Sequence, residues 1–198
     1  SQLATIRGDA RSILSAERLA LNLLGQLSGV ATATRMLVDR VRGTNAKIID
    51  TRKTVPLLRE LQKMAVVAGG GANHRMGLFD QVLIKDNHIQ AVGSPAEAVR
   101  RARTRVGGEI TVEVEIERLE ELEEVIKAGA DVVMLDNMLP SAMRAAVEIA
   151  DGRVLLEASG GITLKTVREV AESGVDLISI GGITHSSPSL DVALDFSA

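Results

Sequence analysis

The stretch ITVEVEIERLEELEEVIKAGADVVMLD, which spans residues 110–136, decides the fold class. It opens with an apolar run of strand length, Ile110–Ile116, and closes with a second one, Asp131–Asp136. The segment between them has helical spacing, with glutamates on one face and an apolar face formed by Leu119, Leu122, Val125 and Ile126. Gly129 follows where a left-handed helix cap is expected. A strand, a helix and a strand in this order predict a βαβ unit of a parallel sheet.

The same alternation continues through the chain after Gly43. Apolar runs of strand length occur at Ala46–Asp50, Val82–Lys85, Ile110–Ile116, Asp131–Asp136, Val154–Ala158 and Val175–Ile180. Amphipathic stretches of helix length lie between them at Leu57–Ala68, Pro95–Arg105, Leu119–Ala128, Ser141–Ala150 and Leu164–Ser173. Runs that do not alternate indicate strands buried on both faces. Six such units favour a closed, TIM-like α/β barrel of about six parallel strands over an open sheet.

The residues before this alternation are predicted to be helical. Apolar residues recur at helical spacing over residues 13–27, with Ser15 as the expected N-cap. A second helix is expected over residues 28–42. It begins with the small residues Ser28–Thr34, which favour close packing against another element. The barrel is therefore expected to follow a helical segment.

Composition narrows the function classes. The chain has 198 residues, of which 45% are hydrophobic and 25% charged, which argues against disorder. The absence of cysteine excludes a disulfide scaffold, a thiolate metal site and a cysteine nucleophile. A net charge of -3, with two Phe and no Tyr or Trp, argues against a nucleic-acid partner bound by base stacking. No apolar run has the ~20 residues of a membrane helix and no signal peptide opens the chain, so we expect a cytoplasmic protein without a membrane partner.

Charged or glycine-rich residues stand at the C-terminal end of every predicted strand. In chain order these ends carry Asp50–Lys53, Lys85–His88, Glu113 with Glu115, Asp136–Asn137, Glu157–Gly161 and Ser179–Gly182, the last followed by Thr184 and His185. In parallel α/β folds these strand ends meet at one edge, where ligands bind. We therefore expect a shared functional site at this mouth.

The residue types at the mouth indicate which ligand it takes. Its basic residues are Arg52, Lys53, His74, Arg75 and Lys85. Arg and Lys bind carboxylates and phosphates, so these residues predict a polyanionic ligand. Glu115 and Asp136, on neighbouring strands, would hold Mg²⁺ or sugar hydroxyls, or else pair with a nearby cation. The glycines of Ser159–Gly161 and Gly181–Gly182, with a helix expected to begin at Thr163, suit a phosphate. Together these features predict metal-assisted transfer on a phosphosugar.

Several strings of residues resemble one known family over nearly the whole chain. They are Ala16–Arg18 with Leu21–Asn22, Leu27–Thr32, Asp50–Thr54, Gly69–Gly71, Asn73–Arg75, Ile84–His88, Glu113–Glu115, Leu135–Asn137, Ser159–Gly161 and Thr184–Ser186. In this order they resemble the quinolinate phosphoribosyltransferases, or carboxylating nicotinate-nucleotide pyrophosphorylases. The resemblance implies a pentosyltransferase that joins quinolinate to the ribose of phosphoribosyl pyrophosphate with Mg²⁺. It would release pyrophosphate and CO₂ and give nicotinate mononucleotide for NAD biosynthesis.

The resemblance also implies how the dicarboxylate is held. Arg52, Arg75 and Lys85 would contact the two carboxylates of quinolinate. Members of the family are homodimers with shared active sites, or higher oligomers, and Arg18 would reach the dicarboxylate in the partner's site.

The remaining matching residues are implied to hold the phosphorylated ribose and the leaving group. Glu115 and Asp136 would bind the ribose hydroxyls or Mg²⁺ and, with Lys85, would act in catalysis. The other residues implied to line the site are Thr51, Lys53 and His74, with Ser159, Gly160, Gly161, Gly181 and His185 around the 5′-phosphate.

The family's domain organisation implies the boundaries expected here. Residues 1–8 would end an N-terminal α/β sandwich domain, residues 9–182 would form the catalytic barrel, and residues 183–198 would form a C-terminal segment that packs back on the sandwich domain. Most of that sandwich domain is expected to be absent, so the sequence leaves open whether the chain is active by itself. One departure from the family is Pro56-Leu57, where Pro-Gly is usual.

Two other functions remain open on the sequence. A related barrel could act on another pyridine or base, as expected for the homologue associated with molybdate-transport operons. The joint presence of Arg18, Arg52, Arg75 and Lys85 favours a dicarboxylate instead. A non-enzymatic phosphosugar-binding module is the other alternative, and the acidic residues Glu115 and Asp136 argue against it.

Overall fold

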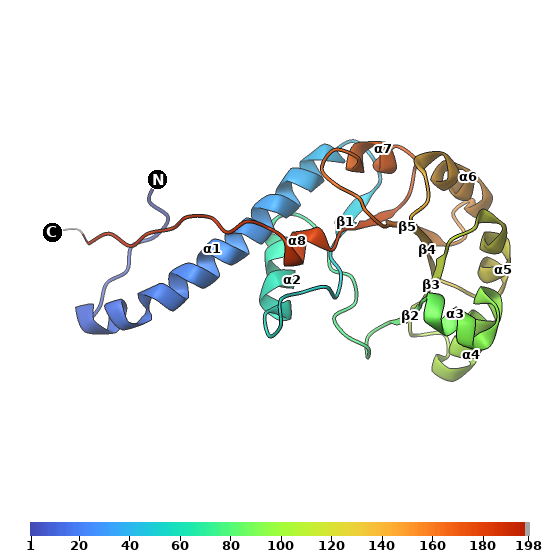
Figure 1. Cartoon of the computed structure of the whole chain (residues 1–198), viewed down its shortest axis with the longest axis horizontal. Coiled ribbons are helices and arrows are strands. Elements are labelled where there is room, and N and C mark those ends of the chain that lie inside the picture. The colour runs from blue at the N-terminus through green and yellow to red at the C-terminus, as the bar shows by residue number, and fades with distance from the viewer. Residues whose placement is uncertain (197–198) are drawn as a thin grey trace.

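One sheet of six parallel strands organises the molecule, in a computed structural model that describes residues 1–196 (Figure 1). The strands are β1 Lys47–Ile49, β2 Val82–Ile84, β3 Val112–Ile116, β4 Val132–Asp136, β5 Leu155–Ser159 and β6 Leu177–Ser179. Their order across the sheet is β1-β6-β5-β4-β3-β2. Five of the six apolar runs singled out in the sequence contain one of these strands, and β5 extends one residue beyond its run to Ser159, so the predicted parallel α/β fold is confirmed.

Helices follow the strands along the chain. They are α2 Arg59–Ala68, α3 Asp86–Val92, α4 Pro95–Val106, the 3₁₀ turn η1 Leu119–Glu121, α5 Leu122–Lys127, α6 Pro140–Ala150, α7 Val167–Ala171 and α8 Gly182–His185. Helices α4 to α7 form an arc outside the strands in Figure 1. Helices α3 and α8 were not predicted, because both begin within strings that the sequence assigned to strand ends. In α3 the imidazole Nδ1 of His88 accepts a hydrogen bond from the Lys85 N–H, which stabilises the first turn.

The ladder of the barrel is open at one seam, between β1 and β2. No register joins these two strands among the described residues. The segment 72–76 lies at the seam instead, and Ala72 forms an isolated parallel bridge with Ile49. The Ala72 N–H donates to Ile48 O at 2.9 Å, and the Asp50 N–H donates to Ala72 O at 3.3 Å. A loop segment therefore continues the barrel wall where a further ladder strand would close it.

The core lies between the strands and the surrounding helices. All five residues of β3 are buried, as expected for a parallel strand covered on both faces. Leu122 and Val125 of α5 are fully buried in the hydrophobic core, while Ile126 is partly buried. The apolar face predicted for this helix is thus confirmed. Gly129 follows it with a φ of 96°, in the left-handed region that glycine adopts readily.

The N-terminal segment is one long helix, and the expectation of two helices is wrong. Helix α1 runs without interruption over Ala10–Arg40. Its N-cap is Asp9, whose carboxylate accepts from the Ser12 N–H at 2.9 Å. The predicted cap, Ser15, lies inside the helix and donates from its hydroxyl to Arg11 O at 2.7 Å. Leucines recur along the whole segment, and this apolar spacing gives no signal for a break between residues 27 and 28.

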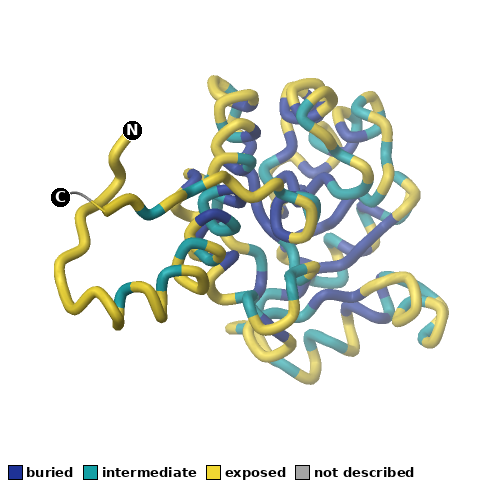
Figure 2. Tube along the Cα trace, turned by 60° about the vertical axis from the view of Figure 1, so that its left-hand side comes forward, coloured by how far each residue is buried: buried dark blue, intermediate teal, exposed yellow. Residues whose placement is uncertain are grey.

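The small residues of α1 allow another segment to approach closely, as predicted. A Cβ on Gly29 would lie 2.0 Å from Pro188 O, and one on Gly25 would lie 2.6 Å from Leu190 O. The Leu190 N–H donates to Gly25 O at 3.0 Å. Figure 2 shows this C-terminal segment beside α1, whose N-terminal half is largely exposed.

The domain boundaries at residues 8 and 182 stay predictions. Residues 1–9 contain no helix or strand, and the boundary at residue 182 falls at the start of α8. Of the predicted segment 183–198, residues 197 and 198 lie outside the described residues. Within the part that is described, no helix has the length and apolar character needed to cross a membrane.

Candidate active site

A cavity of about 700 Å³ opens at the C-terminal ends of the strands. It contains every site residue predicted from the sequence except Arg18. Its wall comprises Thr51, Arg52, Lys53, His74, Arg75, Lys85, Glu115, Asp136, Ser159, Gly160, Gly161, Gly181 and His185, together with Leu83, Met134, Asn137, Glu157, Ile162, Ser179, Ile180 and Gly182. The strand-end pattern therefore located the cavity correctly.

Two arginines, Arg52 and Arg75, line the cavity, and the charge of one acts on the other. Arg52 follows β1, and Arg75 belongs to the seam segment. Arg75 is buried, and its Nη1 donates to Gln81 O at 3.2 Å. Burial lowers the pKa of Arg75, and the positive charge of Arg52 lowers it further. Two like charges held together in a cavity are stabilised by an anion between them, and guanidinium groups bind carboxylates through paired hydrogen bonds.

Two acidic residues of the cavity come from adjacent strands, β3 and β4. Glu115 lies near the end of β3, and Asp136 is the last residue of β4. Lys85 Nζ lies 3.4 Å from Glu115 Oε2. Burial raises the pKa of Glu115; the Lys85 ammonium opposes this shift, while the Asp136 carboxylate adds to it. Carboxylate oxygens on neighbouring strands are the hard ligands that Mg²⁺ prefers, so Glu115 and Asp136 fit the cation that the family resemblance implies.

Glycines shape the part of the cavity that follows β5 and β6. Gly160 has a φ of 97°, and a Cβ there would lie 2.1 Å from Asn137 Oδ1. A Cβ on Gly181 would lie 3.1 Å from Lys53 Cδ. Only glycine fits the close approach at Gly160, and it leaves the backbone accessible to an anion. The expected helix start at Thr163 is wrong, because residues 163–166 form a turn and α7 begins at Val167.

A buried ion pair holds the backbone of the seam segment in place. Lys63 of α2 contacts the Asp50 carboxylate, and both side chains are fully buried. Lys63 Nζ also donates to His74 O at 2.8 Å, and the His74 N–H donates to Asp50 Oδ1 at 2.9 Å. The backbone of His74 is thus tied to both charges. Since Arg75 is the next residue, this pair fixes the position of two cavity residues.

The side chain of His74 faces a second buried group, formed by Glu113 and Glu157. His74 Nε2 lies 3.2 Å from Glu113 Oε2 and 3.7 Å from Glu157 Oε2. The three ligand-type atoms lie within 4.8 Å of one another, which is close enough for a metal ion. However, His74 Nδ1 accepts the Arg75 N–H at 2.6 Å. The neutral ring then carries its proton on Nε2, and a protonated nitrogen does not bind a metal.

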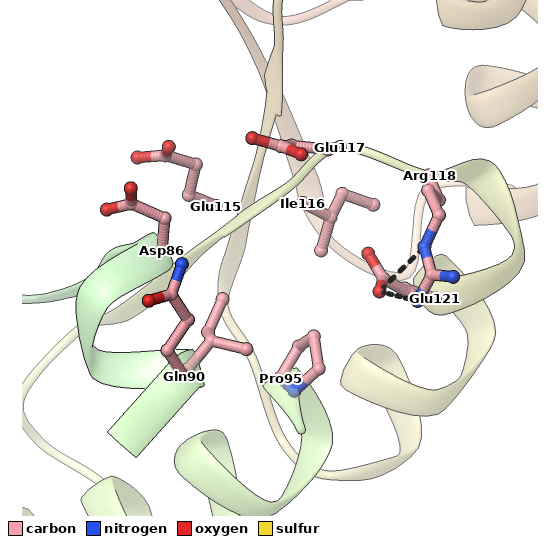
Figure 3. Close-up of a pocket in the computed structure, with 9 residues that line it drawn as sticks. Asp86, Gln90, Pro95, Glu115, Ile116, Glu117, Arg118 and Glu121 are labelled. Atoms are coloured by element: carbon pink, nitrogen blue, oxygen red, sulfur yellow. Dashed lines mark hydrogen bonds and ion pairs between the residues drawn. The ribbon is translucent and has the colours of Figure 1, made fainter. Parts of the chain in front are cut away.

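A smaller acidic hollow of about 320 Å³ adjoins the cavity on the other side of Glu115 (Figure 3). Figure 3 shows Asp86 of α3 and Glu115 of β3 side by side at its edge. Arg118 is paired with Glu121 at 2.5 Å and leaves Glu117 to add to the negative charge. This surface repels phosphates and carboxylates, so a polyanion is directed to the cavity lined by Arg52 and Arg75.

Sequence reasoning missed several residues of the cavity. Glu157, Asn137 and Ser179 stood in the quoted strand ends but were not assigned to the site. A glutamate inside the apolar run Val154–Ala158 was the available signal for Glu157. Arg18 lies exposed on α1 and does not line the cavity of its own chain.

Comparison with known proteins agrees with this geometry. Residues 30–195 match the family model described as the C-terminal domain of quinolinate phosphoribosyl transferase. A probable carboxylating nicotinate-nucleotide pyrophosphorylase of Bacillus subtilis is 49% identical over 98% of this chain and 67% of its own length. The Mycobacterium leprae protein of that name is 48% identical over 98% of this chain and 69% of its own length.

The same similarity holds in three dimensions. The nicotinate-nucleotide pyrophosphorylase of Francisella tularensis superposes with a TM-score of 0.89 at 48% identity, over 93% of this chain and 65% of that one. The chain thus spans about two thirds of the length of these relatives. The family match, the identities and the shared barrel lead to one assignment. This chain belongs to the quinolinate phosphoribosyl transferase family and matches its C-terminal domain.

Proposed function

We propose that this barrel catalyses the transfer of a phosphoribosyl group from phosphoribosyl pyrophosphate to quinolinate, with loss of CO₂. The products are nicotinate mononucleotide and pyrophosphate, in NAD biosynthesis. The observation that carries the proposal is that Arg52 and Arg75 line one cavity with Glu115 and Asp136, and that the charge of Arg52 acts on Arg75. The first pair suits a dicarboxylate and the second suits a ribose with its cation. The relatives of the chain are named for this reaction.

The cavity residues can perform the transfer by orientation and charge. Arg52, Arg75 and Lys85 bind the two carboxylates and direct the pyridine nitrogen at C1 of the ribose, which removes much of the barrier. As pyrophosphate leaves, C1 becomes positive, and the carboxylates of Glu115 and Asp136 stabilise that charge. Mg²⁺ held by these two residues would neutralise the leaving pyrophosphate.

Product formation tests this proposal. The protein is incubated with phosphoribosyl pyrophosphate, Mg²⁺ and quinolinate labelled in its carboxylate next to nitrogen. We expect equal amounts of nicotinate mononucleotide and labelled CO₂. Nicotinate, which lacks the second carboxylate, is the matched control and should react about 10–150-fold more slowly, since one charge-assisted contact is lost. Equal rates with both compounds would favour a barrel with another pyridine as substrate.

We also propose that two copies of the chain share their sites through Arg18. Leu14, Leu19 and Leu24 lie on different sides of α1 near Arg18, and each is about half exposed or more. Exposed apolar side chains on several sides of a helix favour its burial against another chain, and a two-fold axis would bring the same residue of each copy to the other. A homodimer, Mg²⁺ binding and a cytoplasmic location all stay predictions.

Mixed dimers test the shared site. Full-length chains with Arg18→Ala are co-expressed with Lys85→Ala chains under two tags, and the mixed species is isolated. In this dimer one site has lost both residues and the other has lost neither, so about half of the wild-type rate per dimer is expected. A mixed dimer as inactive as its two parents would show that Arg18 acts within its own chain.

A further inference from the structure

The proposed reaction needs a proton donor, a role to which no residue has yet been assigned. When the bond from the ring carbon to its carboxylate breaks, CO₂ leaves and the electron pair stays on that carbon, beside the ribosylated nitrogen. This pair must take a proton before nicotinate mononucleotide can leave. The donor has to line the cavity and carry a proton near neutral pH. The inference rests on the proposed function, because only decarboxylation creates this need.

Most cavity residues do not meet both conditions. The arginines and Lys85 are required as cations for the dicarboxylate, and Glu115 and Asp136 are required as anions. The serine and threonine hydroxyls are too weakly acidic. Burial lowers the pKa of His74, and its one ring proton points from Nε2 toward Glu113. His74 is therefore a neutral ring whose one proton, on Nε2, lies beside the Glu113 carboxylate.

We propose that Glu157 is the acid that protonates the ring carbon after CO₂ leaves. Glu157 lies on β5 and is 1% exposed, yet its side chain forms part of the cavity wall. Its Oε1 and that of Glu113 are both buried without a hydrogen-bond partner among the described residues. Two carboxyls that face each other in a buried site do not both ionise, so the pair holds a proton.

The surroundings of the two carboxyls decide which one keeps that proton. Burial raises the pKa of Glu113 to about 7. The charges of Arg75 and Lys85 and a hydrogen bond from Gln81 Nε2 at 2.6 Å oppose this shift, so Glu113 is the first of the pair to ionise. Glu157 faces the charge of Glu113, the neutral ring of His74 and the hydroxyl of Ser179. Burial, then the Glu113 charge, raises the pKa of Glu157 to about 8.

The proton balance is complete with these groups. The carbon–carboxylate bond breaks and CO₂ departs with no net charge. The electron pair left on the ring carbon takes the proton of the Glu157 carboxyl and forms a C–H bond. Glu157 becomes a carboxylate and regains a proton from water once the product has left.

The test compares Glu157→Gln with the wild type in single-turnover experiments at saturating quinolinate, phosphoribosyl pyrophosphate and Mg²⁺. We expect product formation to slow about 100-fold or more, the usual contribution of a general acid, while the dissociation constants of both substrates stay within about threefold. The wild-type rate should fall as pH rises past about 8, and the variant should lack this decline. Glu157→Asp should recover part of the rate.

Ser179→Ala is the matched control for the pH profile. The Ser179 hydroxyl lowers the pKa of Glu157, so its removal should shift the decline to higher pH without abolishing it. If Glu157→Gln does not fold, infrared spectra of the wild type still test the proposal, since a protonated carboxyl band must be present at neutral pH and disappear above pH ~9. Absence of that band, or a Glu157→Gln variant with the wild-type rate and pH decline, would overturn the inference. A wild type that forms no product would instead refute the proposed function.

Discussion

Two groups of buried charge contact the same residue of the seam segment, and they differ in every respect that matters for function. The Asp50–Lys63 pair holds the backbone of His74, and its charges are opposite. The Glu113–Glu157 pair faces the ring of His74, and its charges are alike. In the first pair each charge has further hydrogen bonds, whereas each carboxyl of the second leaves one oxygen without a partner among the described residues.

The difference separates a structural role from a chemical one. A pair of opposite charges with all its hydrogen bonds made fixes a segment in one position. A pair of like charges is stable only with a proton between them, so it holds that proton close to its release. Only the first pair binds backbone groups of the seam segment, which a ladder strand would have used. The second pair lies on β3 and β5 and meets that segment through the His74 ring.

The largest effect on stability is expected from a substitution that breaks the Asp50–Lys63 pair. Lys63→Met leaves Asp50 buried without its counter-charge and should lower the free energy of unfolding by about 3–5 kcal/mol. Urea denaturation measures this loss. Lys127→Met is the matched control, because Lys127 pairs with Glu123 on the surface at 3.3 Å, and it should leave the midpoint unchanged.

A double variant sharpens the same experiment. Adding Asp50→Asn to Lys63→Met removes the uncompensated charge, so more than half of the lost stability should return. A double variant as unstable as Lys63→Met alone would show that packing of the Lys63 side chain, and not its charge, stabilises the seam.

The next largest effect is the pH dependence of stability that the Glu113–Glu157 pair produces. Glu157 has a native pKa of about 8 against a reference value of 4.5, so between these values the native state holds a proton that the unfolded chain has released. Stability should therefore be complete below pH ~4.5 and fall as pH rises toward ~8, by a few kcal/mol. Glu157→Gln should flatten this decline in urea titrations. An identical slope in both proteins would place the titrating group elsewhere.

The third effect is on quinolinate binding, through Arg52 and Arg75. Arg75→Ala and Arg52→Ala should each weaken quinolinate binding about 10–150-fold, the value of one charge-assisted contact, and should hardly change binding of phosphoribosyl pyrophosphate. Calorimetric titration of each ligand separates the two. Lys63→Met should weaken quinolinate in the same direction as Arg75→Ala, because it releases the segment that carries Arg75. Equal losses for both ligands would mean that these arginines do not bind the dicarboxylate.

The sequence predicted the strands and the cavity wall well, because both depend on local patterns. An apolar run such as Asp131–Asp136 indicates a buried strand without knowledge of its neighbours, and a parallel sheet then brings all strand ends to one edge. The period of Glu113 and Glu115 also placed both on one face of β3, where both are buried. The roles of these residues remain predictions.

What the sequence could not predict depends on partners distant along the chain. Lys63 lies in a stretch with the pattern of an ordinary amphipathic helix, and only the fold brings it to Asp50. Glu157 differs from other strand-end glutamates because Glu113 lies opposite it on another strand. The seam itself was not predicted, since Ala72 belongs to no apolar run of strand length.

The smallest effect lies outside both pairs, at the loop between β1 and α2. Leu57 has a φ of 67° and is fully exposed, at the position where the resemblance noted in the sequence implies glycine. A left-handed conformation costs a side-chain-bearing residue about 1–2 kcal/mol, while the added freedom of glycine in the unfolded chain offsets about 0.5–1 kcal/mol. Leu57→Gly should therefore raise the free energy of unfolding by about 0.5–1 kcal/mol, measured by urea denaturation. Leu57→Ala keeps the strained backbone and should leave the value unchanged, so an equal gain in both variants would mean that the exposed side chain, and not the backbone, is the cause.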